Sequence, residues 1–190
     1  MQHLTYAELE AGLDLIRLSP KDQGRLELIV ARPESNARVV LETAEFSLVD
    51  GLVGDSWKAR GSGRTSDGSA HPEMQVNVMN ARAAALVAQS KERWQLAGDQ
   101  LYVDLDLSGE NLPVGTRLEI GSALLEVTEQ PHTGCKKFVQ RFGLDAMKFV
   151  NSTTGRSLNL RGINTKVVQA GSIRTGDEVV VHRPALPRNA

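Results

Sequence analysis

Apolar residues near the amino terminus recur at helical spacing. Leu9, Leu13 and Ile16 follow Thr5 and Glu8, which have the Thr-x-x-Glu spacing of a capping box. In such a box the two side chains satisfy backbone N–H groups that the first turn of a helix leaves without partners. The sequence therefore predicts a short amphipathic helix at this end of the chain.

After Gly24 the apolar residues alternate with polar ones, which is typical of β-strands. In the first such segment we expect Leu26, Leu28 and Val30 to share one face of a strand. Further short segments follow, many at intervals of roughly ten residues and separated by glycines, and this spacing predicts a meandering sheet that closes on itself. They begin near Val39, Met74, Leu101, Leu118, Leu124, Val167 and Val179.

Other segments break this alternation. Asn80 is placed to cap a helix that follows the strand near Met74, and the residues after Cys135 predict two short helices with a break at Gly143. Five glycines across 51–69 predict a long irregular loop. At the other end of the chain, Gly176 lies in a tight turn that we expect to join a terminal pair of strands.

Composition limits the possible functions. The chain has 190 residues, of which 41% are apolar and 24% charged, as expected for one soluble globular domain. Its 22 Lys and Arg residues against 23 acidic ones give a net charge of −1, so no basic excess favours nucleic acid or an anionic membrane. The sequence contains neither a signal-peptide core nor an apolar run long enough for a membrane span, so we expect a cytoplasmic protein.

One cysteine excludes an internal disulfide and a four-cysteine zinc site. Cys135 lies between a predicted strand and a predicted helix and is followed by Lys136 and Lys137. A helix amino terminus and nearby cations favour the thiolate, which is a nucleophile and a soft-metal ligand. The alternative is an inert, buried cysteine, but two lysines and Gly134 beside it favour an exposed, functional thiol.

Several other residues have weaker chemical indications. His71 and His132 could join Cys135 in a zinc site or act as its base, if the fold brings them together. Arg60, in the glycine-rich loop, and Arg161 are candidates for holding an anion. Taken alone, none of these residues identifies a function.

The order of these motifs resembles the MOSC domain, the carboxyl-terminal domain of molybdenum cofactor sulfurases. The resemblance spans residues 46–182. It rests on Gly51-Leu52-Val53-Gly54-Asp55, Gln75-Val76, Gly109-Glu110-Asn111-Leu112, Gly115 with Leu118-Glu119-Ile120-Gly121, Gly134-Cys135-Lys136, Arg161-Gly162, Gly171-Ser172-Ile173 and Gly176-Asp177-Glu178-Val179. One departure is that Ser56 and Trp57 follow the Gly-Asp of the glycine-rich loop, where the family often has a histidine.

The resemblance implies a mainly β fold: a closed or nearly closed β-barrel, of the MOSC or pyruvate kinase barrel-like type, with a few peripheral α-helices. We expect a helical extension over residues 1–24, the MOSC-like barrel over 25–182, and a disordered tail over 183–190. In the family the cysteine, here Cys135, carries sulfur as a persulfide or ligates the molybdenum of the molybdopterin cofactor. The resemblance then suggests a cofactor-binding set that consists of Arg161, Asn111, Lys136, Arg60 and Asp55.

The resemblance also implies partners. Pyridoxal phosphate chemistry is known in the wider family, but no pyridoxal phosphate domain is recognisable in this chain, so a cysteine desulfurase would have to supply sulfur. In the other role, an electron-donor reductase would support the reduction of N-hydroxylated small molecules. Two alternatives stay open: a ligand-binding barrel with an inert cysteine, and a thiol hydrolase or transferase with His132 or His71 as its base.

Overall fold

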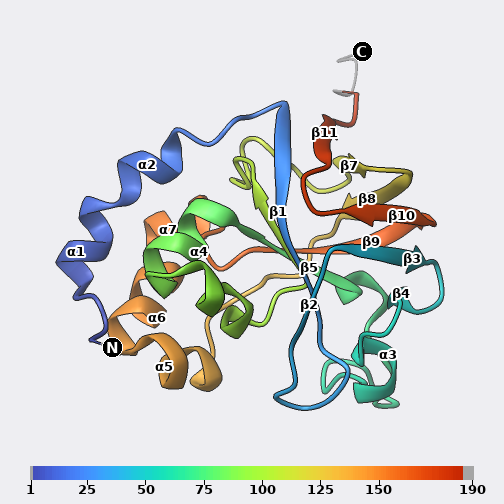
Figure 1. The fold of residues 1–190 in the computed structure, drawn as a ribbon, viewed down its shortest axis with the longest axis horizontal. Coiled ribbons are helices and arrows are strands. Elements are labelled where there is room, and N and C mark those ends of the chain that lie inside the picture. Colours follow the sequence, from blue (N-terminus) through green and yellow to red (C-terminus); the bar gives the residue numbers. More distant parts are fainter. Residues whose placement is uncertain (1, 186–190) are drawn as a thin grey trace.

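The computed structural model describes residues 2–185, which form a mainly β structure with every helix but α3 gathered on one side (Figure 1). The strands are β1 (Gln23–Ala31), β2 (Val39–Leu41), β3 (Thr43–Ser47), β4 (Gly51–Leu52), β5 (Val76–Asn80), β6 (Leu101–Asp104), β7 (Arg117–Ile120), β8 (Ala123–Val127), β9 (Ile163–Gln169), β10 (Gly171–Arg174) and β11 (Glu178–His182). The helices are α1 (Tyr6–Ala11), α2 (Leu13–Arg17), α3 (Trp57–Arg60), α4 (Ala81–Ala88), α5 (Lys136–Phe142), α6 (Leu144–Asn151) and α7 (Thr153–Ser157), with 3-10 helices η1 (Pro72–Met74) and η2 (Lys91–Ala97).

Seven strands form the closed barrel, in the order β11-β7-β8-β9-β5-β6-β1, and the pairing of β1 with β11 completes the ring. Neighbouring strands are antiparallel except β5 and β6, which run parallel and are joined through α4 and η2. The closed barrel predicted above is therefore confirmed. Along one edge of β1, residues 23–25 pair with β11 and residues 29–31 pair with β2, so β2 extends the sheet beyond the ring.

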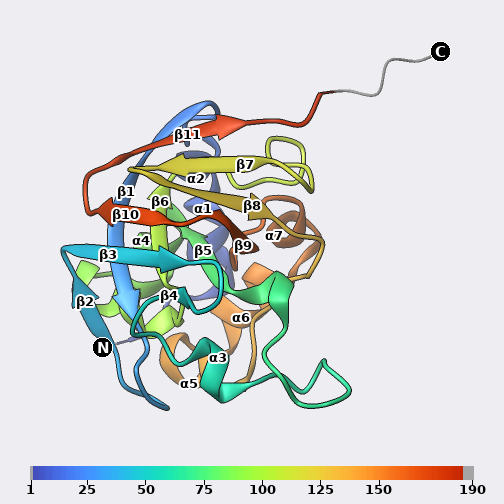
Figure 2. The same ribbon diagram turned by 90° about the vertical axis from the view of Figure 1, so that its right-hand side faces the viewer.

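A small second sheet has the order β10-β3-β4. Figure 2 shows it as a layer beside β7 and β8. Phe46 of β3, Leu52 of β4 and Ile173 of β10 are buried in the same apolar cluster as the barrel interior, so this sheet covers part of that core. The terminal strands formed as predicted, but β10 and β11 do not pair with each other. Their connecting turn at Gly176 carries the chain from the small sheet into the barrel.

Strand β1 differs from the expected pattern of faces. Leu26 and Ile29 lie in the barrel interior, whereas Leu28 and Val30 belong to a second apolar cluster beneath the helices. The pairing of β1 with β6 shifts register between Leu26 and Leu28, and a bulge of this kind turns the following side chains to the opposite face. The prediction that Leu26, Leu28 and Val30 share one face was therefore wrong.

The helices other than α3 lie outside β1, β5 and β6. Helix α1 has the predicted capping box of Thr5 and Glu8, and Asn80 caps α4 by accepting a hydrogen bond from the N–H of Ala83. Leu9 and Ile16 of the amino-terminal helices are buried in the second cluster, together with residues of α4, α5 and α6. Helices α1 and α2 of the expected extension thus pack on the helical side of the barrel, whereas Gln23 and Gly24 already belong to β1.

The glycine-rich segment 51–69 is less irregular than expected, since it contains β4 and the one-turn helix α3. Of the expected tail, residues 186–190 lie outside the described part of the chain. Arg183 is described, and its guanidinium group donates hydrogen bonds to Asn111 and Asp22. Within residues 2–185, none of the helices is long and apolar enough to cross a membrane.

Candidate functional site

Cys135 lies at the start of α5, as predicted, with its side chain exposed. Two hydrogen bonds fix the residue before it: the side chain of Asn151 accepts from the N–H of Gly134 at 2.9 Å and donates to its carbonyl at 3.2 Å. A Cβ on Gly134 would come within 3.1 Å of Val150 and 3.3 Å of Met147, so glycine lets the segment pack closely on α6. The backbone before the exposed thiol is thereby held by two hydrogen bonds and by close packing on α6.

A buried carboxylate lies beside the segment that leads to Cys135. Oδ2 of Asp99 lies 2.6 Å from Nη1 of Arg161, and Oδ1 lies 2.8 Å from Nε2 of His132. Asp99 has no exposed surface, and Arg161 is only 6% exposed. Arg161 also lies over the ring of Phe138 at 5.1 Å, one turn beyond Cys135 on α5. The Arg161 charge and the cysteine helix are thus in direct contact.

The Arg161-Gly162 pair has a structural explanation. Arg161 reaches Asp99 on one side, while Gly162 provides the space in which the ring of His132 packs. A Cβ on Gly162 would lie 3.2 Å from Cδ2 of His132 and 2.4 Å from the carbonyl oxygen of Val78, and its φ of +109° favours glycine. Arg161 therefore pairs with Asp99, and Gly162 leaves room for the histidine that contacts the same carboxylate.

The charges in this cluster set its protonation. Burial opposes ionisation of Asp99, but the charge of Arg161 and the contact with His132 outweigh it and lower the pKa of Asp99 to about 2. Burial lowers the pKa of His132, and the charge of Arg161 lowers it further, whereas Asp99 acts in the opposite direction. At neutral pH the cluster therefore contains an ionised Asp99, a neutral His132 and a charged Arg161.

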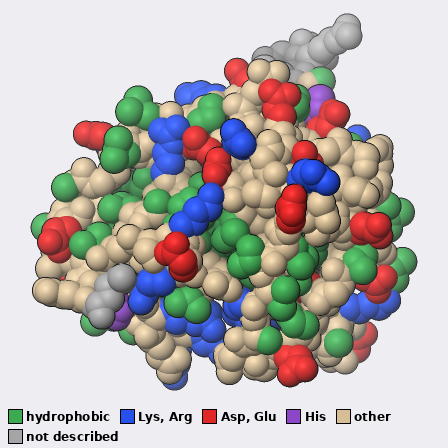
Figure 3. Space-filling view, viewed as in Figure 1, with side chains coloured by type: hydrophobic (Ala, Val, Ile, Leu, Met, Phe, Trp, Pro, Cys, Tyr) green, Lys and Arg blue, Asp and Glu red, His purple; other side chains and the backbone are tan. Residues whose placement is uncertain are grey.

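A second group of cations surrounds the residue before Asp99. Gly98 has a φ of +95°, and a Cβ there would lie 3.5 Å from Nη2 of Arg38 and 3.7 Å from Nη1 of Arg141. Arg32 donates to the carbonyl of Gly98 at 2.8 Å. We call Arg32, Arg38 and Arg141 the arginine cluster. Figure 3 shows Lys and Arg side chains gathered around a hollow in the lower part of the face seen in Figure 1, between the helices and β2.

The cluster carries more positive charge than the chain neutralises. Arg32 pairs with Asp55, but the guanidinium groups of Arg38 and Arg141 bond to the carbonyl groups of Gln95 and Leu96, and neither has an ion pair within residues 2–185. Partial burial lowers the pKa of Arg38, and the charges of Arg141 and Arg32 add to this. Cations held this close together favour an anionic ligand.

Asp55, one of the predicted residues, points into the protein. Its carboxylate is fully buried, accepts from Nε and Nη2 of Arg32 at 2.8 and 3.0 Å, and also accepts from the N–H of Trp57. Arg60, at the end of α3, lies close enough to Arg32 for that charge to lower its pKa, although burial is the larger cause. Asp55 therefore orients the cluster, and Arg60 lies at its border.

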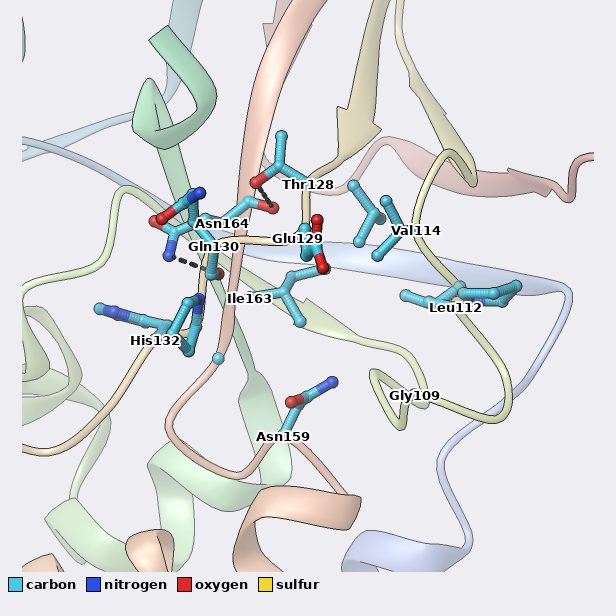
Figure 4. A pocket seen from close by; sticks show the side chains of 14 residues that line it. Gly109, Leu112, Val114, Thr128, Glu129, Gln130, His132, Asn159, Ile163 and Asn164 are labelled. Atoms are coloured by element: carbon cyan, nitrogen blue, oxygen red, sulfur yellow. Dashed lines mark hydrogen bonds between the residues drawn. The ribbon is translucent and has the colours of Figure 1, made fainter. Parts of the chain in front are cut away.

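Buried amides connect the arginine cluster with the segment before Cys135. Arg32 donates to Asn77 at 3.0 Å, Asn77 donates to Asn164 at 2.6 Å, and Asn164 donates to the carbonyl of Gln130 at 3.0 Å. Figure 4 shows the last part of this chain at the wall of a pocket of about 280 Å³, with His132 on one side and Leu112 opposite. The pocket and the cluster thus share the segment that ends at Cys135.

The other predicted residues lie apart from this centre or at its edge. Asn111 is buried and engaged within the chain: its side chain donates to the carbonyls of Lys21 and Asp106 and accepts from Arg183. No contact of the described residues joins Asn111 to the arginine cluster or to Cys135. Lys136 is exposed in the first turn of α5. The structure thus brings Cys135, Arg161, Arg60 and Asp55 to one region and places Asn111 elsewhere.

The zinc alternative was wrong, because no three His, Cys, Asp or Glu side chains of the described chain form a metal-binding group. His71 instead accepts a hydrogen bond from the N–H of Glu73 at the start of η1. His132 is committed to Asp99 through Nε2, which leaves only Nδ1 for any other contact.

Several residues of the site gave no signal that sequence reasoning could use. Asp99, Arg38 and Arg141 are isolated charged residues in unremarkable segments, and Asn151 lies within a predicted helix. Gly98 followed by Asp99 indicates a turn but no chemical role. Their convergence depends on the packing of η2 against α5, which local pattern does not encode.

The barrel and this site together define the class. The MOSC domain model matches residues 65–180, more than half of the chain, so the protein belongs to the MOSC domain family, which is associated with binding of the molybdenum cofactor. No curated protein sequence matches the chain.

Solved structures agree on the fold. The crystal structure of the YuaD protein from Bacillus subtilis is 17% identical, with a TM-score of 0.63, and the match covers 86% of this chain and 97% of YuaD. YiiM from Escherichia coli is 17% identical with a TM-score of 0.55, over 85% of this chain and 71% of YiiM. YiiM from Geobacillus stearothermophilus is 16% identical with a TM-score of 0.51, over 85% and 75%.

Proposed function

We propose that this protein binds the molybdenum cofactor, with the pterin phosphate at the arginine cluster and the metal at the thiolate of Cys135, and reduces N-hydroxylated small molecules with a partner reductase. The observation that carries the proposal is the pair Arg38 and Arg141. Both guanidinium groups lie near the position that a Cβ on Gly98 would occupy, and neither has a carboxylate partner within residues 2–185.

The residues present fit such a group. A phosphate is recognised by guanidinium groups that can donate two hydrogen bonds each, and the cluster holds two that the protein has not neutralised. The Nε atoms of Arg161 and Arg93 are buried and have no hydrogen-bond partner among residues 2–185, so unused donors remain close to the cluster. The exposed Cys135 begins α5, and Arg141 of the cluster lies in the last turn of the same helix. A thiolate is the protein ligand that molybdenum, a soft to borderline metal, favours.

The cofactor, when bound, supplies redox chemistry that no side chain provides. The protein's own contribution is binding and orientation. Asn151 fixes the backbone before Cys135. Arg161 places its charge over Phe138 of α5, and Asp55 orients Arg32 towards Gly98. Reduction of an N-hydroxylated compound also needs electrons, and we expect them to come from an electron-donor reductase.

The direct test is metal content. The full chain, produced in a host that makes molybdopterin, should contain molybdenum near one atom per chain, and Cys135→Ser should lose it. The cofactor-free forms of the two proteins should unfold at the same temperature, which shows that the variant is folded. Arg141→Gln should lower the pterin content, because it removes a guanidinium group that faces Gly98. Arg174→Gln is the matched control, since this exposed arginine lies on β10, away from the cluster. Wild-type protein without molybdenum or pterin would overturn the proposal.

A second role is favoured by one observation, which is that Cys135 is a free cysteine with an exposed side chain. Such a thiolate could accept sulfur as a persulfide from a cysteine desulfurase. Cyanide-labile sulfur on metal-free protein, absent from Cys135→Ser, would indicate this carrier role. Molybdenum that depends on both Cys135 and Arg141 would indicate the reductase.

A further inference from the structure

His132 has one ring nitrogen that the protein fixes and one that it leaves free. Nε2 lies 2.8 Å from Asp99, which accepts hydrogen bonds but cannot donate when ionised, so Nε2 carries the proton. Nδ1 has no hydrogen-bond partner within residues 2–185. It is also not one of the buried side-chain atoms left without a partner, so Nδ1 is not buried. The side chain is 15% exposed. Nδ1 therefore presents a lone pair to solvent or to a bound molecule.

The charges that face the imidazole come from three elements. Asp99, after η2, holds Nε2; Arg161, before β9, pairs with the second oxygen of Asp99; and Arg32, in β1, is close enough to act on His132 through its charge. Both arginines and burial favour the neutral ring, while Asp99 stabilises the protonated one. A buried aspartate behind a histidine with one free nitrogen is the arrangement used for proton transfer.

His132 also belongs to the region around Cys135. It lies three residues before Cys135, and its ring packs on Gly162. Arg161, which shares Asp99 with it, contacts Phe138 on the helix that Cys135 begins. Figure 4 shows the segment from Thr128 to His132 running along the pocket wall.

We propose that His132 transfers protons at this site, through Nδ1, with Asp99 as its positioning residue. The proposal rests on the reductase function above. Cleavage of the N–O bond of an N-hydroxylated amine takes up two electrons and two protons and yields the amine and water. The electrons come from a reduced flavin or iron–sulfur partner. The imidazolium form of His132 gives up its Nδ1 proton and then takes another from water, once for each proton consumed.

The test is a pH profile of the molybdenum-loaded full chain, with reduced methyl viologen as the electron source and an N-hydroxylated amine as substrate. The acid form of His132 is the donor, so kcat should fall as pH rises through its pKa, which lies below the usual value. His132→Gln can still donate to Asp99 but cannot titrate. We expect it to lose this pH dependence and to lower kcat by about 10²- to 10⁴-fold, with unchanged molybdenum content.

His182→Gln is the matched control, because this histidine is half exposed on β11 and pairs with Glu119. Asp99→Asn should move the fall in kcat to lower pH, since the carboxylate that stabilises the imidazolium is gone. A loaded His132→Gln protein with the wild-type rate and profile would overturn the proton-transfer role alone. A wild-type chain without molybdenum would overturn the proposed function instead.

A second readout needs no cofactor. In the ¹⁵N-labelled full chain at pH 7, NMR should show His132 neutral, with the proton on Nε2 and a free Nδ1. This imidazole should titrate below the usual histidine value of about 6.5. A proton on Nδ1, or a ring that is charged at neutral pH, would overturn the proposal.

Discussion

Asn151 holds both backbone polar groups of Gly134, accepting from its N–H at 2.9 Å and donating to its carbonyl at 3.2 Å. The pair joins α6 to the residue before Cys135, although the two lie 17 positions apart. One side-chain amide thereby replaces the regular hydrogen bonds that a loop lacks. The position of the thiol consequently depends on a helix that has no chemistry of its own.

Asn151→Ala should loosen the cysteine segment. The variant loses two hydrogen bonds to a half-buried backbone, so we expect a loss of about 1–2 kcal/mol of unfolding free energy. Hydrogen exchange of residues 133–136 should accelerate, while exchange of β5 and β6 should follow global stability only. Equal protection of residues 133–136 in both proteins would show that the amide does not fix the segment.

Much of the fold was predictable because local patterns specify it. The capping box of Thr5, the cap at Asn80 and the alternating segments each reflect a local rule, and the resulting strands close a barrel. The failures also have local causes. A bulge reversed the faces of β1 after Leu26, and the turn at Gly176 moved the chain from one sheet to another. Neither event changes the hydrophobic pattern in a recognisable way.

The candidate site was less predictable. Cys135 and Arg161 stood out through their neighbours and lie in one region of the structure. Asp99 could not be identified, because its role arises from contacts with His132 and Arg161, which lie 33 and 62 positions further along the chain. Asn111 stood out for its motif, yet its side chain is used to tie a turn to Arg183. Motifs therefore identified chain segments, while the direction of each side chain came from packing.

Gly162→Ala should be strongly destabilising. The residue has a φ of +109°, and a Cβ would lie 2.4 Å from the carbonyl oxygen of Val78. Because that oxygen belongs to the backbone, the clash can be relieved only if β5 moves. Strain of this kind costs about 1–3 kcal/mol before the steric clash is added. Urea denaturation measures the loss. Gly63→Ala is the control, since nothing lies within 4 Å of its Cβ and its φ is not positive; equal midpoints for the two variants would contradict the explanation.

Acid should destabilise the protein in two stages. The pKa of His132 is lower in the folded protein than in the unfolded chain. As pH drops below 6.5, the unfolded chain therefore takes up a proton before the folded protein does, and the free energy of unfolding falls. The pKa of Asp99 is lowered from 3.8 to about 2, and its contribution of about 2 kcal/mol is lost between those values. Urea denaturation of wild type and His132→Gln from pH 7 to 3 should show a flatter upper stage in the variant. Parallel curves would mean that His132 does not titrate on unfolding.

Inorganic pyrophosphate should stabilise the cofactor-free protein through the arginine cluster. A ligand that binds only the folded state at a hundred times its Kd adds about 2.7 kcal/mol, which raises Tm by roughly 5–10 °C in a domain of this size. Arg38→Gln and Arg141→Gln should each reduce this shift, because each removes a guanidinium group that faces Gly98. Arg174→Gln should keep it, since that exposed side chain lies beside Glu42. Sodium chloride at matched ionic strength separates binding from general screening. An equal Tm shift in all four proteins would place the anion outside the cluster.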